Sequence, residues 1–100
     1  MARIIWTEPA LQELDEIADY ISLDDPRAAK KLVQECFNRI DYLTEHPKSG
    51  KALAEFEASV YREIVLPPCR IFYRIDGEIV YIIHVIREEQ LLHLEILKFR

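Results

Sequence analysis

The sequence predicts an α+β fold in which a hairpin of two helices packs on a small antiparallel sheet. The predicted order is β-α-α-β-β-β, followed by a short C-terminal element. Two observations support this. Two stretches between residues 8 and 46 carry apolar residues at helical spacing. Apolar runs on both sides of Asp76-Gly77 have the composition of strands joined by a tight turn. The 100 residues are expected to form one domain, 1–100, with its own core.

The N-terminal elements are predicted from their capping residues. Residues 3–6 (RIIW) favour an edge or second-layer strand. Thr7 is the expected N-cap of the first helix, whose acidic residues, Glu13 among them, should face solvent. Asp25 is the expected N-cap of the second helix, and His46-Pro47 should end it. Because the link between the helices is short, they should form an antiparallel hairpin that covers one face of the sheet.

The Asp76-Gly77 pair sets the predicted register of the last two strands. Asp-Gly readily takes positive φ at both central positions of a two-residue loop. This loop predicts the cross-strand pairs Arg74–Ile79, Phe72–Tyr81 and Arg70–Ile83. Opposed residues share a face and neighbours along a strand do not. The predicted core side carries Ile71, Tyr73, Val80, Ile82, His84 and Ile86. The predicted open side carries Arg70, Phe72, Arg74, Ile79, Tyr81, Ile83 and Arg87.

Three segments stay open. Residues 47–59 have no clear period, although 52–58 could form one or two helical turns. Pro67-Pro68 cannot supply the positive φ of a primed hairpin turn, so the register of residues 60–66 is undetermined. Whether Arg62 shares a face with Arg70 is therefore undecided. Residues 88–100 fit a helix or a strand equally well.

Composition and charge restrict the function. A net charge of -5 argues against broad attraction to nucleic acid, so we expect no specific DNA binding by this chain alone. No apolar stretch approaches the roughly 20 residues of a membrane helix, and no signal peptide is apparent. Cys36 and Cys69 are expected to be buried thiols in a reducing cytoplasm. His46 and His93 lack the spacing of a metal site, and we expect no metal or cofactor.

The order of these elements resembles the RelE/ParE superfamily of bacterial toxins, the toxic half of type II toxin–antitoxin pairs. The matching stretches are TEPALQELDEIADYI, DYLTEHPKSG and YREIVLPPCRIFYRIDGEIVYIIHV, followed by Arg87. The resemblance covers nearly the whole chain and implies a cognate antitoxin wrapped across the toxin. RelE-like members cleave mRNA in the ribosome, using basic residues on the open sheet face. ParE-like members have no established nuclease activity and are associated with poisoning DNA gyrase.

The RelE-type catalytic pattern transfers only in part. By resemblance, Arg62 takes the place of one catalytic lysine, and Arg70 and Arg87 take the places of arginines. Ile64 occupies the position of the second lysine, and no tyrosine follows in the tail. Phosphodiester cleavage needs an acid, a base and charge on the phosphate. The resemblance therefore favours a ParE-like toxin that acts on gyrase by protein–protein contact. A RelE-like nuclease that uses the three arginines and a non-toxic binding or repression module are the alternatives.

The predicted contact residues for antitoxin or target are Arg70, Phe72, Arg74, Tyr81 and Arg87. A structural explanation competes with this one. The arginines could bond nearby carboxylates such as Glu88 and Glu89, and aromatic residues in strands mostly serve packing. For His84, a hydrogen-bonded core histidine is the simpler interpretation.

Overall fold

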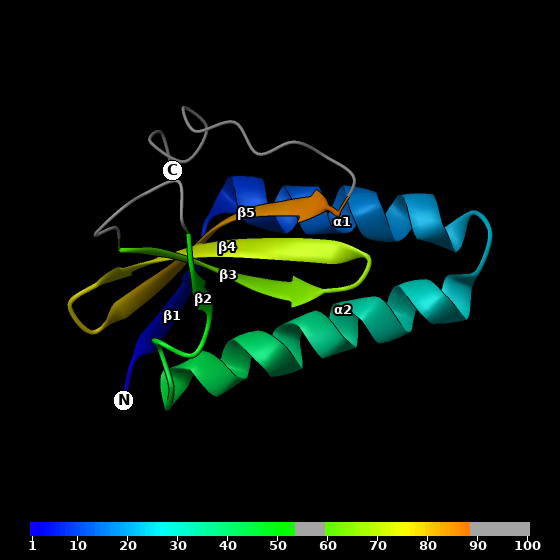
Figure 1. Ribbon diagram of the computed structural model, residues 1–100. Coiled ribbons are helices and arrows are strands. Elements are labelled where there is room, and N and C mark those ends of the chain that lie inside the picture. Colours follow the sequence, from blue (N-terminus) through cyan, green and yellow to red (C-terminus); the bar gives the residue numbers. More distant parts are fainter. Residues whose placement is uncertain (54–59, 89–100) are drawn as a thin grey trace.

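The computed structural model describes residues 1–53 and 60–88 (Figure 1). The predicted C-terminal element lies outside the described residues, as do most of the helical turns predicted within 52–58. The elements in chain order are β1 (Arg3–Trp6), α1 (Glu8–Ser22), α2 (Pro26–Asp41), the 3₁₀ helix η1 (Tyr42–Thr44), β2 (Lys51–Ala52), β3 (Tyr61–Leu66), β4 (Cys69–Asp76) and β5 (Ile79–Arg87).

The two helices pack on one face of a five-stranded sheet with strand order β1-β5-β4-β3-β2. This confirms the α+β class and the helical hairpin. The sheet is mixed rather than antiparallel, because β1 pairs in parallel with β5. Both helices and the strands β2, β3 and β4 lie between β1 and β5 in the sequence. A connection of this length allows β1 and β5 to run in parallel as neighbours. The two-residue strand β2 was not predicted.

Both predicted N-caps are confirmed. The Thr7 hydroxyl accepts a hydrogen bond from the Ala10 amide at 3.4 Å and donates one to the Ile82 carbonyl at 2.8 Å. The Asp25 carboxylate accepts from the amides of Arg27 and Ala28 at 3.1 and 3.2 Å. These side chains satisfy amides that have no partner within their own helix. Thr7 also ties the start of α1 to the middle of β5.

The main core lies between the helices and the sheet. Its largest fully buried members are Tyr73, Ile40, Leu43, Ile71, Ile82, Val80, Val85, Cys36 and Cys69. Both cysteines are thiols outside any disulfide and are 0% exposed, as the sequence predicts. Burial, together with the neighbouring Cys69, raises the pKa of the Cys36 thiol from 9.0 to about 12. Burial also raises the pKa of the Tyr73 hydroxyl.

These pKa shifts predict a loss of stability above pH 9. Between pH 9 and 12, the thiol of Cys36 is ionised in the unfolded chain and protonated in the folded one. The unfolded state then binds fewer protons, so the free energy of unfolding falls by up to about 1.4 kcal/mol per pH unit. Urea unfolding at pH 7, 9 and 10 should show this fall, and Cys36→Ala should reduce it. An equal fall in the variant would contradict the assignment.

The predicted register of the last hairpin was wrong. Asp76 pairs with Ile79, so the loop residues are Gly77 and Glu78, with Gly77 at φ +60° in the first loop position. A single glycine therefore supplies the positive φ, and the loop moves one residue along the chain. Arg74 now pairs with Tyr81 instead of Ile79. Because this is a shift of two residues, side chains near the turn keep their predicted faces.

A β-bulge changes the faces further along β5. Tyr73 pairs with Ile82 but Phe72 pairs with His84, which leaves Ile83 as the extra residue. Beyond the bulge, every side chain of β5 is on the face opposite to the prediction. His84 lies opposite Phe72, Val85 joins the main core, and Ile86 and Arg87 exchange the faces predicted for them.

The connection between β3 and β4 contains only Pro67 and Pro68, joined by a cis peptide bond, because Leu66 already pairs with Cys69. No helix in the described residues is long and apolar enough to cross a membrane. The described residues also contain no group of three or more His, Cys, Asp or Glu side chains that could hold a metal ion.

Candidate functional site

The sheet face opposite the helices, here called the outer face, carries the predicted contact residues of β4. It is less open than predicted. Phe72 and Ile83 are 0% exposed and Ile86 is 4% exposed, and they form a second small core with Leu53, which follows β2. Tyr61 and Tyr81 pack partly against this cluster. The expectation that Phe72 contributes to an exposed apolar patch is therefore wrong for the described structure.

Arg70 on the outer face forms an ion pair within the chain. Its Nε and Nη2 both lie 2.9 Å from Oε2 of Glu63, whose side chain is only 10% exposed. The Arg70 guanidinium also lies 5.0 Å from the centroid of the Phe72 ring. The competing structural explanation thus holds for Arg70, whose carboxylate partner is Glu63 of β3. The sequence could not identify this partner because the register of β3 was open.

Arg74, four residues further along β4, has a weaker ion pair than Arg70. Its guanidinium lies 4.3 Å from the centroid of the Tyr81 ring, and the cross-strand register places Tyr61 on its other side. Its ion pair with Asp76 is 3.5 Å long, and the Asp76 side chain is 67% exposed. The result is a row of Tyr61, Arg74 and Tyr81 across the outer face, next to the Gly77 turn.

The other two arginines of the nuclease alternative, Arg62 and Arg87, lie on the helix side of the sheet. The Arg87 guanidinium lies 5.1 Å from the centroid of the Tyr20 ring in α1. Arg62 is opposite Tyr73, on the face away from Arg70, and donates to the carbonyls of Lys48 and Gly50 at 3.1 and 2.7 Å.

The three arginines of the nuclease alternative are therefore not gathered in one place. Arg70 is on the outer face, whereas Arg62 and Arg87 are on the helix side. Along the sheet, Arg87 is level with Leu66, four residues from Arg62 on β3, a separation of roughly 13 Å along the strand. The geometry does not place these charges on a single phosphate.

Arg62 instead belongs to a latch that closes the loop after η1 onto the sheet. The Tyr73 hydroxyl donates to the Pro47 carbonyl at 2.7 Å and accepts from the Gly50 amide at 2.9 Å. A Cβ at Gly50 would lie 2.5 Å from this hydroxyl, so the loop approaches the sheet more closely than any other residue allows. No sequence pattern predicted these two hydrogen bonds. Gly50 is 23 positions before Tyr73 in the sequence, and Pro47 is 26 positions before it.

A second polar cluster closes the edge of β5. Where β1 ends, α1 runs alongside β5 (Figure 1), and Glu13 reaches the strand. Its Oε1 accepts from the Val85 amide at 3.2 Å, and its Oε2 lies 2.6 Å from Nδ1 of His84. His84 is 4% exposed and its ring stacks on Phe72 at 6.0 Å. The prediction of a hydrogen-bonded core histidine is confirmed, whereas the solvent-facing position predicted for Glu13 is wrong.

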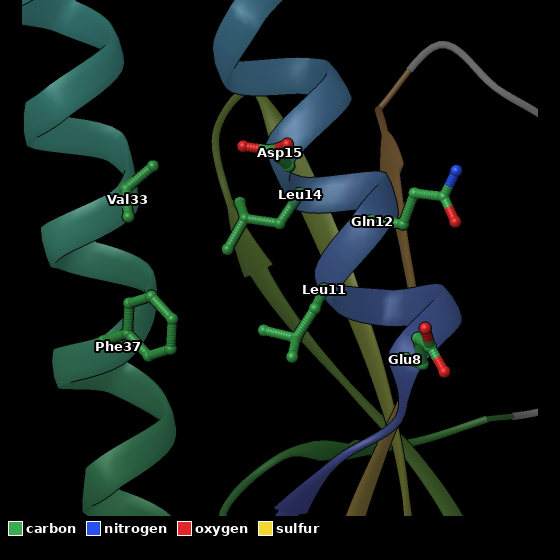
Figure 2. Close-up of a pocket in the computed structure, with 7 residues that line it drawn as sticks. All are labelled: Glu8, Leu11, Gln12, Leu14, Asp15, Val33 and Phe37. Atoms are coloured by element: carbon green, nitrogen blue, oxygen red, sulfur yellow. The ribbon is translucent and has the colours of Figure 1, made fainter.

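The outer surface of the helical hairpin contains a groove of about 420 Å³ (Figure 2). Leu11 and Leu14 of α1 point across it towards Val33 and Phe37 of α2. Leu11 is 42% exposed and Phe37 40%, and the acidic side chains at the rim are Glu8 and Asp15. Such a groove can accept the apolar side of an amphipathic helix that carries basic residues.

Comparisons with known proteins agree with this architecture. Residues 4–92 match the family model described as "ParE toxin of type II toxin-antitoxin system, parDE". The chain is 43% identical to the protein Y4kP of Sinorhizobium fredii, over 82% of this chain and 86% of the relative. It is 32% identical to toxin RelE2 of Caulobacter vibrioides, over 85% of this chain and 93% of the relative.

Two solved structures share the fold. A chain of the chromosomal ParDE toxin–antitoxin system from P. aeruginosa is similar, with a TM-score of 0.71 and 29% identity. The similarity covers 89% of this chain and 98% of that one. A chain of the toxin–antitoxin complex RelBE2 from Mycobacterium tuberculosis has a TM-score of 0.58, covering 87% and 98% of the two chains. At 23% identity, the second similarity bears on the fold alone.

Proposed function

We propose that this chain, which belongs to the family of ParE toxins of type II toxin–antitoxin systems, arrests growth by protein–protein contact with DNA gyrase. A cognate antitoxin would neutralise it, and both events would take place in the cytoplasm. The observation that carries the proposal is the dispersal of the arginines. Arg70 is neutralised by Glu63, and Arg62 is committed to the loop on the opposite face. A protein that acts by contact does not need these charges to converge.

The second candidate is ribosome-dependent cleavage of mRNA. It is favoured by the 32% identity to a relative named toxin RelE2. Arg70 would then have to leave Glu63 in order to hold a phosphate. When the arginine leaves a buried, hydrogen-bonded pair, the carboxylate stays buried without a partner for its charge, which is energetically costly. The ground-state geometry therefore supports the nuclease less well than the gyrase inhibitor.

The two candidates are separated by assays on the purified chain. We expect gyrase supercoiling to be inhibited, and mRNA in a translating ribosome extract to stay intact. The triple variant Glu63→Gln/Arg70→Gln/Arg87→Gln, which spares Arg62 and leaves no unpaired carboxylate at position 63, should still fold and arrest growth when induced. Cleaved mRNA with normal supercoiling would reverse the assignment. Normal growth despite soluble wild-type protein would contradict both candidates and favour the non-toxic module.

The predicted contact residues separate into two groups under this proposal. Arg74 and Tyr81 are partly exposed on the outer face and available to a partner. Phe72 supports that face from beneath, and Arg87 contacts α1 on the other side of the sheet. We therefore propose that the antitoxin contacts the outer face around Arg74 and Tyr81.

A further inference from the structure

We infer that Arg74 anchors the antitoxin by receiving one of its carboxylate side chains in a bidentate pair. The inference deepens the proposed function, since it takes the neutralising antitoxin as the partner. It concerns the row of Tyr61, Arg74 and Tyr81 at the turn end of the outer face. It assigns different roles to Arg74 and Arg70, which the sequence pattern treats alike.

The first argument is the unused hydrogen-bonding capacity of Arg74. A guanidinium has five N–H donors in a planar fork. Arg70 directs two nitrogens at the buried Glu63 carboxylate. Arg74 makes one contact of 3.5 Å to the exposed Asp76, the kind of surface pair that contributes little. Within residues 1–53 and 60–88, no other carboxylate is recorded in contact with Arg74.

The second argument is that the guanidinium is already held in position. It stacks on the Tyr81 ring at 4.3 Å, and Tyr61 is its partner across the β3–β4 ladder. The side chain is 26% exposed, so its end can be reached while its stem is packed. A fork that is fixed before binding loses little conformational entropy when a carboxylate arrives.

The third argument concerns the chemistry of the partner. Nucleic-acid phosphates are held by several cations acting together. Here one arginine lies 3.5 Å from a single carboxylate, that of Asp76, in a chain whose net charge of -5 repels a polyanion. A single guanidinium fork matches one carboxylate, which accepts two parallel N–H bonds and can take the place of the long contact to Asp76. The geometry thus points to an acidic side chain on a protein partner.

The test uses the product of the neighbouring open reading frame that restores growth when expressed with this toxin, and measures its dissociation constant for variants of the toxin. Arg74→Ala should weaken binding about 30-fold or more, the usual effect of truncating one side of a buried charge pair. Arg74→Lys keeps the charge but loses the fork and the stacking, so it should also weaken binding clearly. The matched control is Arg39→Ala, an exposed arginine on α2, which should change binding less than twofold.

Charge reversal identifies the partner residue. Against Arg74→Glu, each acidic residue of the toxin-binding segment of the antitoxin is changed to arginine in turn, and one of these changes should restore binding. If Arg74→Lys binds the antitoxin as tightly as wild type, the bidentate pair is overturned. If Arg74→Ala binds it as tightly as wild type, Arg74 is not an anchor. Binding of a single-stranded RNA oligonucleotide that depends on Arg74, with unchanged antitoxin affinity, would assign the site to nucleic acid instead. Thermal unfolding of each variant verifies that it folds.

The outcomes also separate this inference from the proposed function. If the Arg74→Ala toxin still arrests growth and the antitoxin no longer neutralises it, the result supports both the proposed function and the role of Arg74. Wild-type toxin that binds antitoxin through Arg74 yet leaves growth and gyrase unaffected would sink the proposed function alone. Growth arrest by gyrase inhibition, with equal neutralisation of wild type and Arg74→Ala, would sink the inference alone.

Discussion

Replacing Gly50 with alanine is expected to lower the free energy of unfolding by about 3 kcal/mol, the upper range for overpacking a tight site. The new methyl group would lie 2.5 Å from the Tyr73 hydroxyl and 2.9 Å from the Glu63 carbonyl. Neither atom can move cheaply, because Tyr73 is fully buried and the carbonyl belongs to β3. Pushing the loop away would instead break the Gly50–Tyr73 and Arg62–Gly50 hydrogen bonds.

Urea unfolding measures this effect, with Ser49→Ala as the control. Ser49 is exposed and directly precedes Gly50, and its replacement by alanine should change the free energy of unfolding by about 0.5 kcal/mol or less. A Tyr73→Phe background removes the hydroxyl but keeps the ring carbon Cε1, which lies 2.6 Å from the added methyl group, so it isolates the share of the cost that comes from the hydroxyl and its hydrogen bonds. In that background Gly50→Ala should cost less, a non-additivity expected of residues in contact. Equal stability of Gly50→Ala and wild type would show that the loop can move away from Tyr73 without cost. The latch would then make no contribution to the free energy of unfolding.

The latch illustrates what the sequence could not supply. The helices and their N-caps follow from local patterns at Thr7 and Asp25, and the structure confirms them. Tyr73 was correctly assigned to the core side by alternation along β4. Its hydroxyl partners at Pro47 and Gly50, however, lie in a loop without any period. A contact of this kind depends on the final path of the loop, which no local preference determines.

The bulge in β5 explains most of the errors at the candidate site. Alternation predicts faces correctly only while the ladder is regular. The extra residue Ile83 reverses the alternation of faces in the rest of β5. Arg87 therefore lies on the helix side and Ile86 on the outer face. Nothing in the run IVYIIHVIR marks Ile83 as the extra residue. On β4, which has no extra residue, Arg70 and Arg74 kept their predicted face, and only their partners had to come from the structure.

The second large effect is expected at Glu13, where alanine should lower the free energy of unfolding by about 3 kcal/mol, because two buried donors lose their acceptor at a cost of about 1–3 kcal/mol each. The Val85 amide and His84 Nδ1 would both lose this carboxylate in a region where Val85 is 2% and His84 4% exposed. The matched control is Asp19→Ala, an exposed acid on the same helix, which should change stability by about 0.5 kcal/mol or less.

Glu13→Gln tests which part of the contact matters. Its amide oxygen can still accept from the Val85 amide, so the backbone bond at the strand edge survives while the charge opposite His84 is lost. Its stability should therefore lie between those of wild type and Glu13→Ala. Amide hydrogen exchange gives a local measure, since Val85 should lose protection in the alanine variant more than in the glutamine variant. If Val85 stays equally protected in both, the edge of β5 is closed by packing against α1 alone, and the carboxylate is dispensable.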